Sequence, residues 1–397
     1  MTTFNFSLSK RASTATSSVI REILKVTERP DVISFAGGLP SPEGFPVEKL
    51  RQAYDTVMSN HPKVALQYGP TEGYRPLREW VVSDFKARGV DITVDNVLVV
   101  SGSQQALDLI GKLFIDEGSK VVLESPSYLG AIQSFNQFGP TYAAVPTDEL
   151  GLVPEGLTDE IAKDARFLYA LPNFQNPTGR TLNLERRIAL VKRCAELNLP
   201  LIEDDPYGEL RFEGEALPGL FALSQQYGGT VIRMGSFSKV LAPGMRIGFV
   251  IAPEAIIAKM VQLKQATDLH TASITQMAVY EAVKDGFLTE HLPKVRELYK
   301  RQCGYMLEAL EENFKGIDVT WTHPSGGMFL WLTFNESINT TELLPRAVDE
   351  QKVAYVPGQP FYPLADKPVT NNLRLSFVTV PEDKIRTGIA NLAKLFK

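Results

Sequence analysis

The chain reads Arg233-Met-Gly-Ser-Phe-Ser-Lys-Val-Leu-Ala-Pro-Gly-Met-Arg-Ile-Gly-Phe-Val250 where two apolar segments, residues 230–234 and 247–252, are joined by a polar turn. Both segments have the length and composition of buried strands. Too little chain lies between them for a crossover helix, so we expect an antiparallel pair. The other strands of the predicted sheet precede this pair in the sequence.

Five further apolar segments precede the pair, and most are separated by segments with helical periodicity, such as 104–114, 128–138 and 184–197. Near-continuous apolar strands that alternate with helices are typical of a parallel sheet covered on both faces. We therefore predict an α/β fold with a mostly parallel, seven-stranded sheet. The five further strand candidates are residues 97–101, 120–124, 141–145, 166–171 and 199–203.

A smaller α+β domain is expected after residue 285. It begins with a long helical pattern over 287–314, and the rest alternates strands with helices. The predicted strands are 317–321, 327–334, 353–356 and 372–378, and the predicted helices are 341–352 and 381–396. We predict three parts: an N-terminal helix and arm over 1–45 that joins the small domain, a large domain over 46–284, and the small domain over 285–397.

The composition describes an ordinary globular chain. It has 397 residues, 44% hydrophobic residues and a formal net charge of −5. We find no run of five basic residues, no apolar stretch of about 18 residues and no signal-peptide pattern, so nucleic acid and membranes are not expected partners. We expect a cytoplasmic protein. The two cysteines and four histidines lack the spacing of a metal site or a disulfide framework.

Polar residues cluster where five predicted strands end. Ligands of open α/β sheets bind beyond the carboxyl ends of the strands, so these clusters should meet at one site. Hydroxyls, a helix N-terminus and a guanidinium suit a phosphate, and a lysine beside an apolar strand can become a nucleophile. The clusters begin at Ser101, Ser125, Asn173, Glu203 and Gly235.

Six motifs in order resemble those of fold type I pyridoxal-phosphate aminotransferases, and in particular the subgroup of aminoadipate, kynurenine and aromatic aminotransferases. The resemblance extends over nearly the whole chain. The motifs are Tyr68-Gly-Pro-Thr-Glu-Gly-Tyr, Ser101-Gly-Ser-Gln-Gln-Ala-Leu, Asn176-Pro-Thr-Gly, Asp204-Asp-Pro-Tyr, Gly235-Ser-Phe-Ser-Lys and Asn372-Leu-Arg-Leu-Ser. The resemblance implies pyridoxal 5'-phosphate as cofactor and transfer of an amino group from an L-amino acid to a 2-oxo acid, such as 2-oxoglutarate, by a ping-pong cycle.

The resemblance also implies roles for the residues of these motifs. Lys239 would bind the cofactor aldehyde and move a proton at the substrate, with Asp204 at the pyridine nitrogen. Asp205 competes for that role, but the family's spacing of three positions between Asp and Tyr matches Asp204 and Tyr207. The other cofactor contacts implied are Tyr207 and Asn176 at the phenolate oxygen, Ser103, Gln104, Ser236, Ser238 and Arg246 at the phosphate, and Tyr128 stacked on the ring.

Four further residues follow from the resemblance. Arg374 would bind the substrate α-carboxylate, and Gly38, with Asn176, would also contact the substrate; a solvated strand arginine is the alternative for Arg374. Tyr68 would reach the phosphate of a neighbouring subunit, which implies a homodimer. Arg21 lies in a helical pattern of Val19, Ile20, Ile23 and Leu24. It would contact the distal carboxylate of acidic substrates, or it is a solvent-facing charge.

Two alternatives stay open at this point. A carbon-sulfur β-lyase can share the fold and most of the cofactor contacts, because the fate of the substrate carbanion depends on pocket details. Related domains in some transcription regulators act as ligand sensors beside a winged-helix segment. We expect the segment before Gly37 to be too short for such a head.

Overall fold

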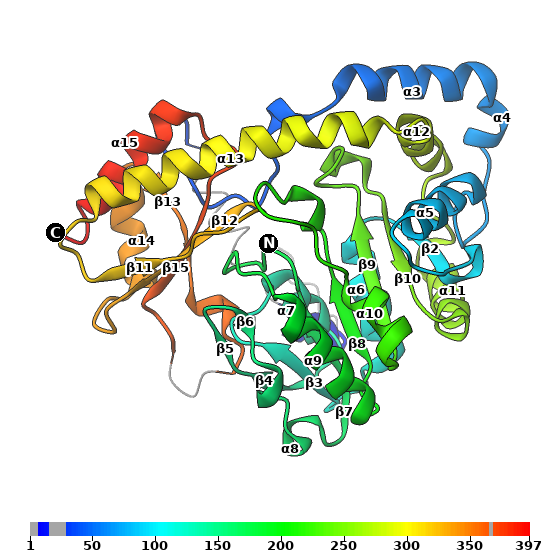
Figure 1. Ribbon diagram of the computed structural model, residues 1–397, viewed down its shortest axis with the longest axis horizontal. Helices are drawn as coiled ribbons and strands as arrows, with labels where there is room; N and C mark the ends of the chain where they lie inside the picture. Colours follow the sequence, from blue (N-terminus) through cyan, green and yellow to red (C-terminus); the bar gives the residue numbers. More distant parts are fainter. Residues whose placement is uncertain (1–6, 16–28, 365–367) are drawn as a thin grey trace.

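The computed structural model describes residues 7–15, 29–364 and 368–397. Its centre is a seven-stranded sheet with the strand order β2-β10-β9-β8-β7-β3-β4 (Figure 1). Only β10 runs antiparallel, to both β2 and β9. All seven predicted strands are confirmed: β2 (Val97–Val100), β3 (Lys120–Glu124), β4 (Thr141–Val145), β7 (Ala165–Ala170), β8 (Leu201–Asp204), β9 (Val231–Ser236) and β10 (Gly248–Ile251).

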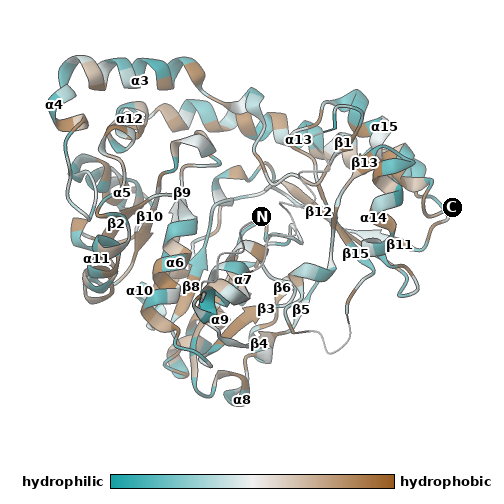
Figure 2. Cartoon of the chain, turned by 180° about the vertical axis from the view of Figure 1, so that it is seen from behind, coloured by the Kyte–Doolittle hydropathy of each residue, from teal (hydrophilic) through white to brown (hydrophobic). Residues whose placement is uncertain are grey.

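Helices cover both faces of this sheet, as predicted. Because side chains alternate along a strand, Phe167 and Tyr169 pack into one apolar layer while Leu168 and Ala170 pack into the other. The first layer is closed by α6 (Ser103–Phe114), α7 (Leu129–Asn136) and α11 (Glu254–Asp268), and the second by α5 (Arg75–Ala87), α9 (Leu184–Glu196) and α10 (Leu220–Tyr227). Figure 2 shows the resulting hydrophobic colour in strands such as β3 and β10.

The smaller α+β unit lies beside the sheet and is reached by the 27-residue helix α13 (Phe287–Asn313) (Figure 1). Its four-stranded sheet has the order β11-β12-β15-β14. These strands are β11 (Val319–Trp321), β12 (Phe329–Phe334), β14 (Val356–Pro357) and β15 (Asn372–Ser376), with helices α14 (Thr340–Asp349) and α15 (Glu382–Ala393). The predicted strands and helices of this region are therefore confirmed, with shifts of a few residues at their ends.

The N-terminal arm contacts the small unit. Strand β1 (Ile33–Ser34) pairs in parallel with β13 (Val353–Ala354). The backbone N–H of Ser376 donates to the carbonyl of Phe35 at 2.8 Å. These contacts agree with the predicted grouping of the arm, although the three domain boundaries stay predictions. The helical pattern around Arg21 lies outside the described residues.

Besides α5, α10 and α11, several elements were not predicted, most of them short or exposed. They are α1 (Lys10–Thr14), α3 (Val47–Asn60), α4 (Pro62–Ala65), α8 (Asp159–Ala162), α12 (Ser273–Val283), β5 (Thr147–Asp148) and β6 (Gly151–Leu152). The arm of α3 and α4 lies along one side of the molecule (Figure 1). It exposes a group of apolar side chains, which we call the α3–α4 apolar face: Val47, Met58, Val64, Leu66 and Tyr68.

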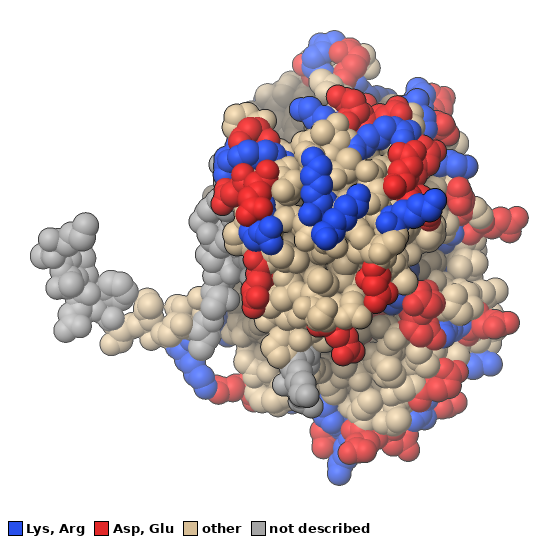
Figure 3. All heavy atoms as spheres, turned by 90° about the vertical axis from the view of Figure 1, so that its left-hand side faces the viewer, with Lys and Arg blue, Asp and Glu red and all other residues tan. Residues whose placement is uncertain are grey.

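The surface charge is mixed on the face seen in Figure 3, where lysines and arginines lie among acidic residues. Among the described residues, the helices are all too short or too polar to cross a membrane.

Candidate active site

The polar clusters that follow the parallel strands meet at the carboxyl edge of the central sheet. The register of β7, β8 and β9 aligns Ala170, Glu203 and Arg233 across adjacent strands, so the loops that follow lie side by side. The N-terminal arm and strand β15 approach the same edge, because Gly38 and Arg374 both contact residues of these loops. The predicted site residues therefore come from both sheets.

Lys239 lies in the turn after β9. Its Nζ donates a hydrogen bond to the carbonyl oxygen of Gly38 at 2.8 Å. Burial, together with the nearby cations Arg374 and Arg246, lowers the pKa of Lys239 to about 8. An amine with such a pKa is uncharged in a substantial fraction of molecules near neutral pH, so Lys239 can act as a nucleophile and as a base.

An anion can be held at the N-terminus of α6. The N-cap residue Gly102 has a φ of +83°, and no side chain caps this end of the helix. Free backbone N–H groups at a helix N-terminus favour negative charge. A Cβ on Gly102 would lie 2.4 Å from Nη2 of Arg246, so glycine lets this guanidinium approach the turn. Ser103 is the first residue of α6 and follows Gly102. A Cβ on Gly248 would lie 3.0 Å from the backbone nitrogen of Ser103.

The other predicted phosphate ligands lie around this turn or next to the lysine. Ser236 ends β9, and its Oγ accepts a hydrogen bond from the backbone N–H of Ser238 at 3.1 Å. The Nε2 of Gln104 donates to the carbonyl of Gly130 at 3.5 Å. Arg246 donates weakly to the carbonyl of Ser101 at 3.4 Å, so it keeps donors for an external anion.

Two adjacent carboxylates after β8 have different surroundings. Oδ2 of Asp204 accepts a hydrogen bond from the Tyr169 hydroxyl at 2.6 Å, and burial raises the pKa of Asp204 to about 7. Asp205 is also buried, which raises its pKa, but Arg233 at 2.7 Å, a hydrogen bond from Asn173 and the charge of Arg187 together outweigh burial, so the net direction is downward. Asp205 also accepts from the backbone N–H of Gly208. Asp205 is thus paired within the protein, whereas Asp204 can pair with a protonated nitrogen of a ligand.

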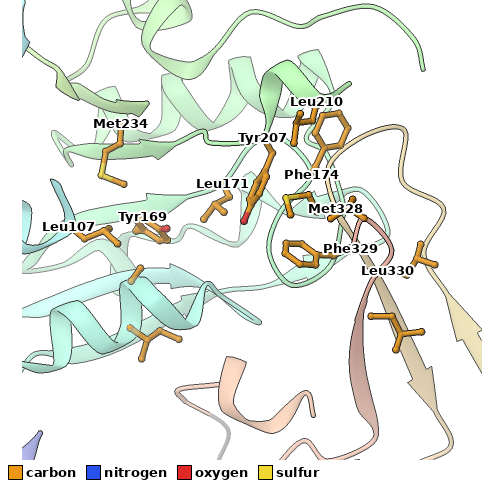
Figure 4. Close-up of a cluster of buried hydrophobic side chains, with 14 of the residues drawn as sticks. Leu107, Tyr169, Leu171, Phe174, Tyr207, Leu210, Met234, Met328, Phe329 and Leu330 are labelled. Atoms are coloured by element: carbon orange, nitrogen blue, oxygen red, sulfur yellow. The ribbon is translucent and has the colours of Figure 1, made fainter. Parts of the chain in front are cut away.

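A chain of polar contacts joins the two sheets. Nη1 of Arg374 donates to Oδ1 of Asn176 at 2.7 Å, and Nδ2 of Asn176 donates to the Tyr207 hydroxyl at 3.4 Å. Nη2 of Arg374 donates to the carbonyl of Ala36 at 3.0 Å. Figure 4 shows Tyr207 beside Phe329, and their ring centroids are 5.9 Å apart. The amide and the phenol can therefore present donors to the same ligand atom.

Arg374 is 1% exposed, so the alternative of a solvated strand arginine is wrong. All five residues of β15 are buried. The guanidinium of Arg374 lies over the ring of Phe329 at 4.3 Å and near that of Phe361 at 5.5 Å. Burial lowers the pKa of Arg374 to about 10. Among the described residues its Nε has no hydrogen-bond partner. A buried donor without a partner is costly, which is the state expected of a group that binds a ligand carboxylate.

Three predicted site residues remain: Tyr128, Tyr68 and Arg21. Tyr128 precedes α7, and burial raises its pKa to about 12. Its ring packs against Gly130, where a Cβ would lie 2.5 Å from ring atoms. Tyr68 is 78% exposed and meets the ring of His270 edge-to-face at 5.8 Å, so its hydroxyl is available to another molecule. Arg21 lies outside the described residues.

Two residues of this region were missed by the sequence analysis. Tyr169 is the partner of Asp204 described above (Figure 4). Glu124 ends β3, is buried, and accepts a hydrogen bond from Nε2 of Gln175 at 3.0 Å. Burial raises the pKa of Glu124 to about 8. A charged residue type at the end of an apolar strand was the available signal for Glu124, whereas nothing in the sequence pairs Tyr169 with Asp204.

Glu124 leads to a prediction about stability. Because its folded-state pKa of about 8 lies above the ordinary value of 4.5, its stabilising contribution is complete below about pH 4 and is lost as the pH rises through 8. One such group changes the free energy of unfolding by about 1.4 kcal/mol per pH unit between the two pKa values. The variant Glu124→Gln should therefore lose less stability between pH 5 and pH 8 in urea unfolding of the cofactor-free protein.

The exposed Glu160→Gln is the matched control and should keep the wild-type slope. An identical slope for Glu124→Gln and wild type would mean that Glu124 is ionised in the folded protein throughout this range.

The residues present fit pyridoxal phosphate on observations of this structure. Arg246 lies beside an uncapped helix N-terminus. Among the described residues the buried Asp204 is in no ion pair, and Lys239 is an amine whose pKa is lowered by burial and by Arg374 and Arg246. Among the described residues there is no cluster that could hold a metal ion. The arrangement can bind a ligand that carries a phosphate, a basic ring nitrogen and a carbonyl group, next to a second ligand with a carboxylate.

Comparisons with known proteins give the same picture. The profile of the family "Aminotransferase class I and II" matches residues 30–392. The chain is 44% identical to a 2-aminoadipate transaminase from Thermus thermophilus, over 98% of this chain and 96% of the relative. It is 42% identical to aromatic-amino-acid aminotransferase 1 from Thermococcus litoralis, over 98% and 94% of the two chains. A crystal structure of an α-aminoadipate aminotransferase from Thermus thermophilus, complexed with N-(5'-phosphopyridoxyl)-L-leucine, superposes with a TM-score of 0.90 at 42% identity, covering 98% of this chain and 97% of that one.

Proposed function

Because the chain belongs to the family of class I and II aminotransferases and is a pyridoxal-phosphate-dependent transaminase of fold type I, we propose that it takes the amino group of 2-aminoadipate, glutamate, leucine or an aromatic amino acid. The acceptor is a 2-oxo acid, for which we propose 2-oxoglutarate, and the two half-reactions follow each other in a ping-pong cycle. The observation that carries this proposal is the buried Arg374, whose Nε has no partner among the described residues, beside an amine of lowered pKa.

We assign the cofactor contacts residue by residue. When bound, pyridoxal phosphate supplies an aldehyde that condenses with amines and a ring that withdraws electrons from the substrate α-carbon. Lys239 supplies the amine that binds the aldehyde. Asp204 accepts a hydrogen bond from the pyridine N–H and holds that proton in place. The backbone and side chains of Ser103 and Gln104, together with Ser236, Ser238 and Arg246, bind the phosphate.

The remaining contacts set orientation and proton transfer. Tyr207 and Asn176 donate hydrogen bonds to the phenolate oxygen, and Tyr128 stacks on the ring. With the cofactor bound and the substrate amine in place of Lys239, the free ε-amine of Lys239 would act as the base that holds and moves the proton of the substrate α-carbon. Arg374 fixes the substrate α-carboxylate, and the carbonyl of Gly38 faces the substrate and the lysine. Arg374 and the phosphate-binding residues thus hold the substrate α-hydrogen near one base, the amine of Lys239.

The choice of substrates rests on the relatives. One relative is named a 2-aminoadipate transaminase, another an aromatic-amino-acid aminotransferase, and a solved relative holds a leucine adduct. This range of side chains requires a pocket that accepts both a carboxylate and apolar groups. We propose that Arg21 binds the distal carboxylate of acidic substrates and is withdrawn when an apolar side chain enters.

The Arg21 proposal gives a prediction about specificity. Replacing Arg21 with alanine should raise the Michaelis constant for aminoadipate and glutamate by about tenfold, because one charged hydrogen bond is lost. The constant for leucine should stay within twofold. Steady-state kinetics with the three amino acids measures both effects, and Arg11→Ala serves as a control on another N-terminal arginine. Equal increases for acidic and apolar substrates would remove the specificity role.

We also propose a homodimer in which Tyr68 reaches the phosphate of the neighbouring subunit. The support is the α3–α4 apolar face, on which Val47 is 70%, Leu66 is 69% and Tyr68 is 78% exposed. Five large apolar side chains exposed within residues 47–68 are more than the single scattered ones of an ordinary solvent-facing surface, and such groups are typical of protein interfaces. Sedimentation of the holoenzyme tests the dimer, and a monomer at micromolar concentration would contradict it.

A half-reaction tests the proposed function directly. The purified, cofactor-bound protein is mixed with one L-amino acid at a time, and the visible absorbance of the bound cofactor is followed. Loss of the band with aminoadipate, glutamate, leucine or an aromatic amino acid, and its return on adding 2-oxoglutarate, supports the transaminase and ranks its donors. Release of pyruvate and ammonia would favour a β-lyase, and ligand binding without turnover would favour a sensor.

A further inference from the structure

A polar network contacts the turn that opens α6 through Ser101 and Gln105. Its centre is the ion pair between Lys264 and Asp268 at the end of α11, with Nζ–Oδ distances of 2.7 and 2.8 Å. Gln105 completes the contacts of Lys264, because its Oε1 accepts from Nζ at 2.9 Å. The three N–H donors of the ammonium group therefore have three acceptor atoms. The network thereby joins α11 to the first turn of α6.

The network also holds the residues that flank Gly102. Nε2 of Gln105 donates to Oδ2 of Asp268 at 2.7 Å, and Oε1 of Gln105 accepts from the backbone N–H of Ser101 at 2.8 Å. The Ser101 hydroxyl lies 3.1 Å from Oδ2 of Asp268 and 3.1 Å from Oγ1 of Thr271. Both ends of the turn 101–105 are thus bonded to one carboxylate, directly or through one amide.

Because the ammonium group of Lys264 is buried, its charge is costly unless all of its hydrogen-bond partners are present. Lys264 is 0% exposed, whereas the side chain of Asp268 is 27% exposed. A buried ammonium group without its partners is strongly destabilising, and replacing an ion pair by apolar groups is often neutral for stability. Stability alone therefore does not explain the ion pair between Lys264 and Asp268. Its placement under a helix N-terminus that has no side-chain cap suggests a role in the geometry of that turn.

We propose that Asp268, held by Lys264, is a positioning residue that fixes the turn 101–105 in the conformation that binds the cofactor phosphate. The carboxylate orients Ser101 and Gln105, and through them the backbone N–H groups of Ser103 and Gln104 that would meet the phosphate. This inference rests on the proposed function only in taking these N–H groups as the phosphate site. Asp268 touches neither the cofactor nor the substrate in this assignment.

Two ligands that differ by one phosphate test the proposal. The dissociation constants of pyridoxal phosphate and of pyridoxal are measured by absorbance on the full-length, cofactor-free protein. The double variant Lys264→Met/Asp268→Asn removes both charges together and so avoids a buried unpaired charge. We expect it to weaken pyridoxal phosphate by about tenfold and to leave pyridoxal within about twofold, because lost hydrogen bonds to the turn affect the phosphate alone.

The matched control lies on the same pair of helices. Lys112 lies about two helical turns after Gln105 on α6, and its Nζ donates to Oγ1 of Thr267 on α11 at 2.9 Å. Lys112→Met should leave both dissociation constants unchanged. The variant Ser101→Ala removes only one hydroxyl, and we expect it to weaken pyridoxal phosphate by about threefold. It provides the decisive measurement if the double variant has a lower thermal midpoint than the wild type.

The outcomes separate the inference from the proposed function. Equal weakening of both ligands, or no weakening of either, by the double variant and by Ser101→Ala would overturn the positioning role. If the wild-type protein bound pyridoxal as tightly as pyridoxal phosphate, residues 101–104 would not be the phosphate site, and this inference would be wrong as well.

Discussion

Lys239→Ala should reduce the rate of transamination by about 10⁴-fold, the upper range for loss of a positioned acid–base group. The variant loses both the amine that binds the cofactor aldehyde and the base that moves the substrate α-proton. The proposed phosphate contacts should remain in the variant, because among the described residues Lys239 donates a hydrogen bond only to the carbonyl of Gly38. Steady-state assays with leucine and 2-oxoglutarate measure the rate, and ultrafiltration measures retained cofactor.

A rescue experiment separates the chemical role from a structural one. A small primary amine such as methylamine can occupy the space of the deleted side chain and should restore part of the proton-transfer rate. Lys259→Ala is the matched control, since Lys259 is exposed on α11 and its Nζ donates to Oε1 of the exposed Gln262 at 3.0 Å. A Lys239→Ala variant that turns over at the wild-type rate would show that another residue is the base.

Arg374→Ala should lower kcat/KM for L-amino acids by about 10²- to 10³-fold, because truncating one partner of a buried, hydrogen-bonded charge pair costs about 2–5 kcal/mol. The effect should depend on the substrate carboxylate. With 3-methylbutylamine, which resembles leucine without its carboxylate, the variant and the wild type should react at similar low rates. The comparison is made by following the loss of the cofactor band in single-turnover experiments.

Arg374→Lys distinguishes geometry from charge. Lysine keeps the positive charge but offers no planar pair of donors, and it cannot reproduce the contacts with both Asn176 and Ala36. We expect it to recover at most about one tenth of the lost activity. If Arg374→Ala reduced the reaction of the amine and of leucine equally, the arginine would support the pocket rather than bind the carboxylate.

Most of the sheet could be predicted because its strands are buried on both faces. Segments such as residues 167–171 are continuously apolar, and the short connection before residue 247 identified the antiparallel pair. Helices α3 and α12 were missed for opposite reasons. Helix α3 has an apolar stripe of Leu50, Ala53, Tyr54 and Val57 that the sequence analysis overlooked, whereas α12 is buried on several sides and presents no single stripe.

The site was predictable where one motif contains the chemistry. Lys239 and Arg374 stand out in short patterns, and the spacing to Tyr207 favoured Asp204 over Asp205, which the structure pairs with Arg233. Contacts between distant segments could not be foreseen, because no local pattern encodes them. Tyr169 bonds to Asp204 from the adjacent strand, and Lys264 bonds to Gln105 across 159 positions. The roles assigned to the site residues remain proposals until these variants are measured.

The backbone of the N-terminal arm accepts hydrogen bonds from two of these side chains, since the carbonyl of Ala36 bonds to Arg374 and that of Gly38 to Lys239. Under the proposed roles, a substrate carboxylate would compete with the Ala36 carbonyl for Arg374, and the cofactor aldehyde would compete with the Gly38 carbonyl for the Lys239 amine. Ligand binding and the docking of the arm are therefore linked equilibria, and thermodynamic reciprocity requires each to change the other by the same factor. A substitution that loosens β1 from β13 should alter substrate affinity without touching the pocket, and a bound substrate should change amide exchange in residues 33–38.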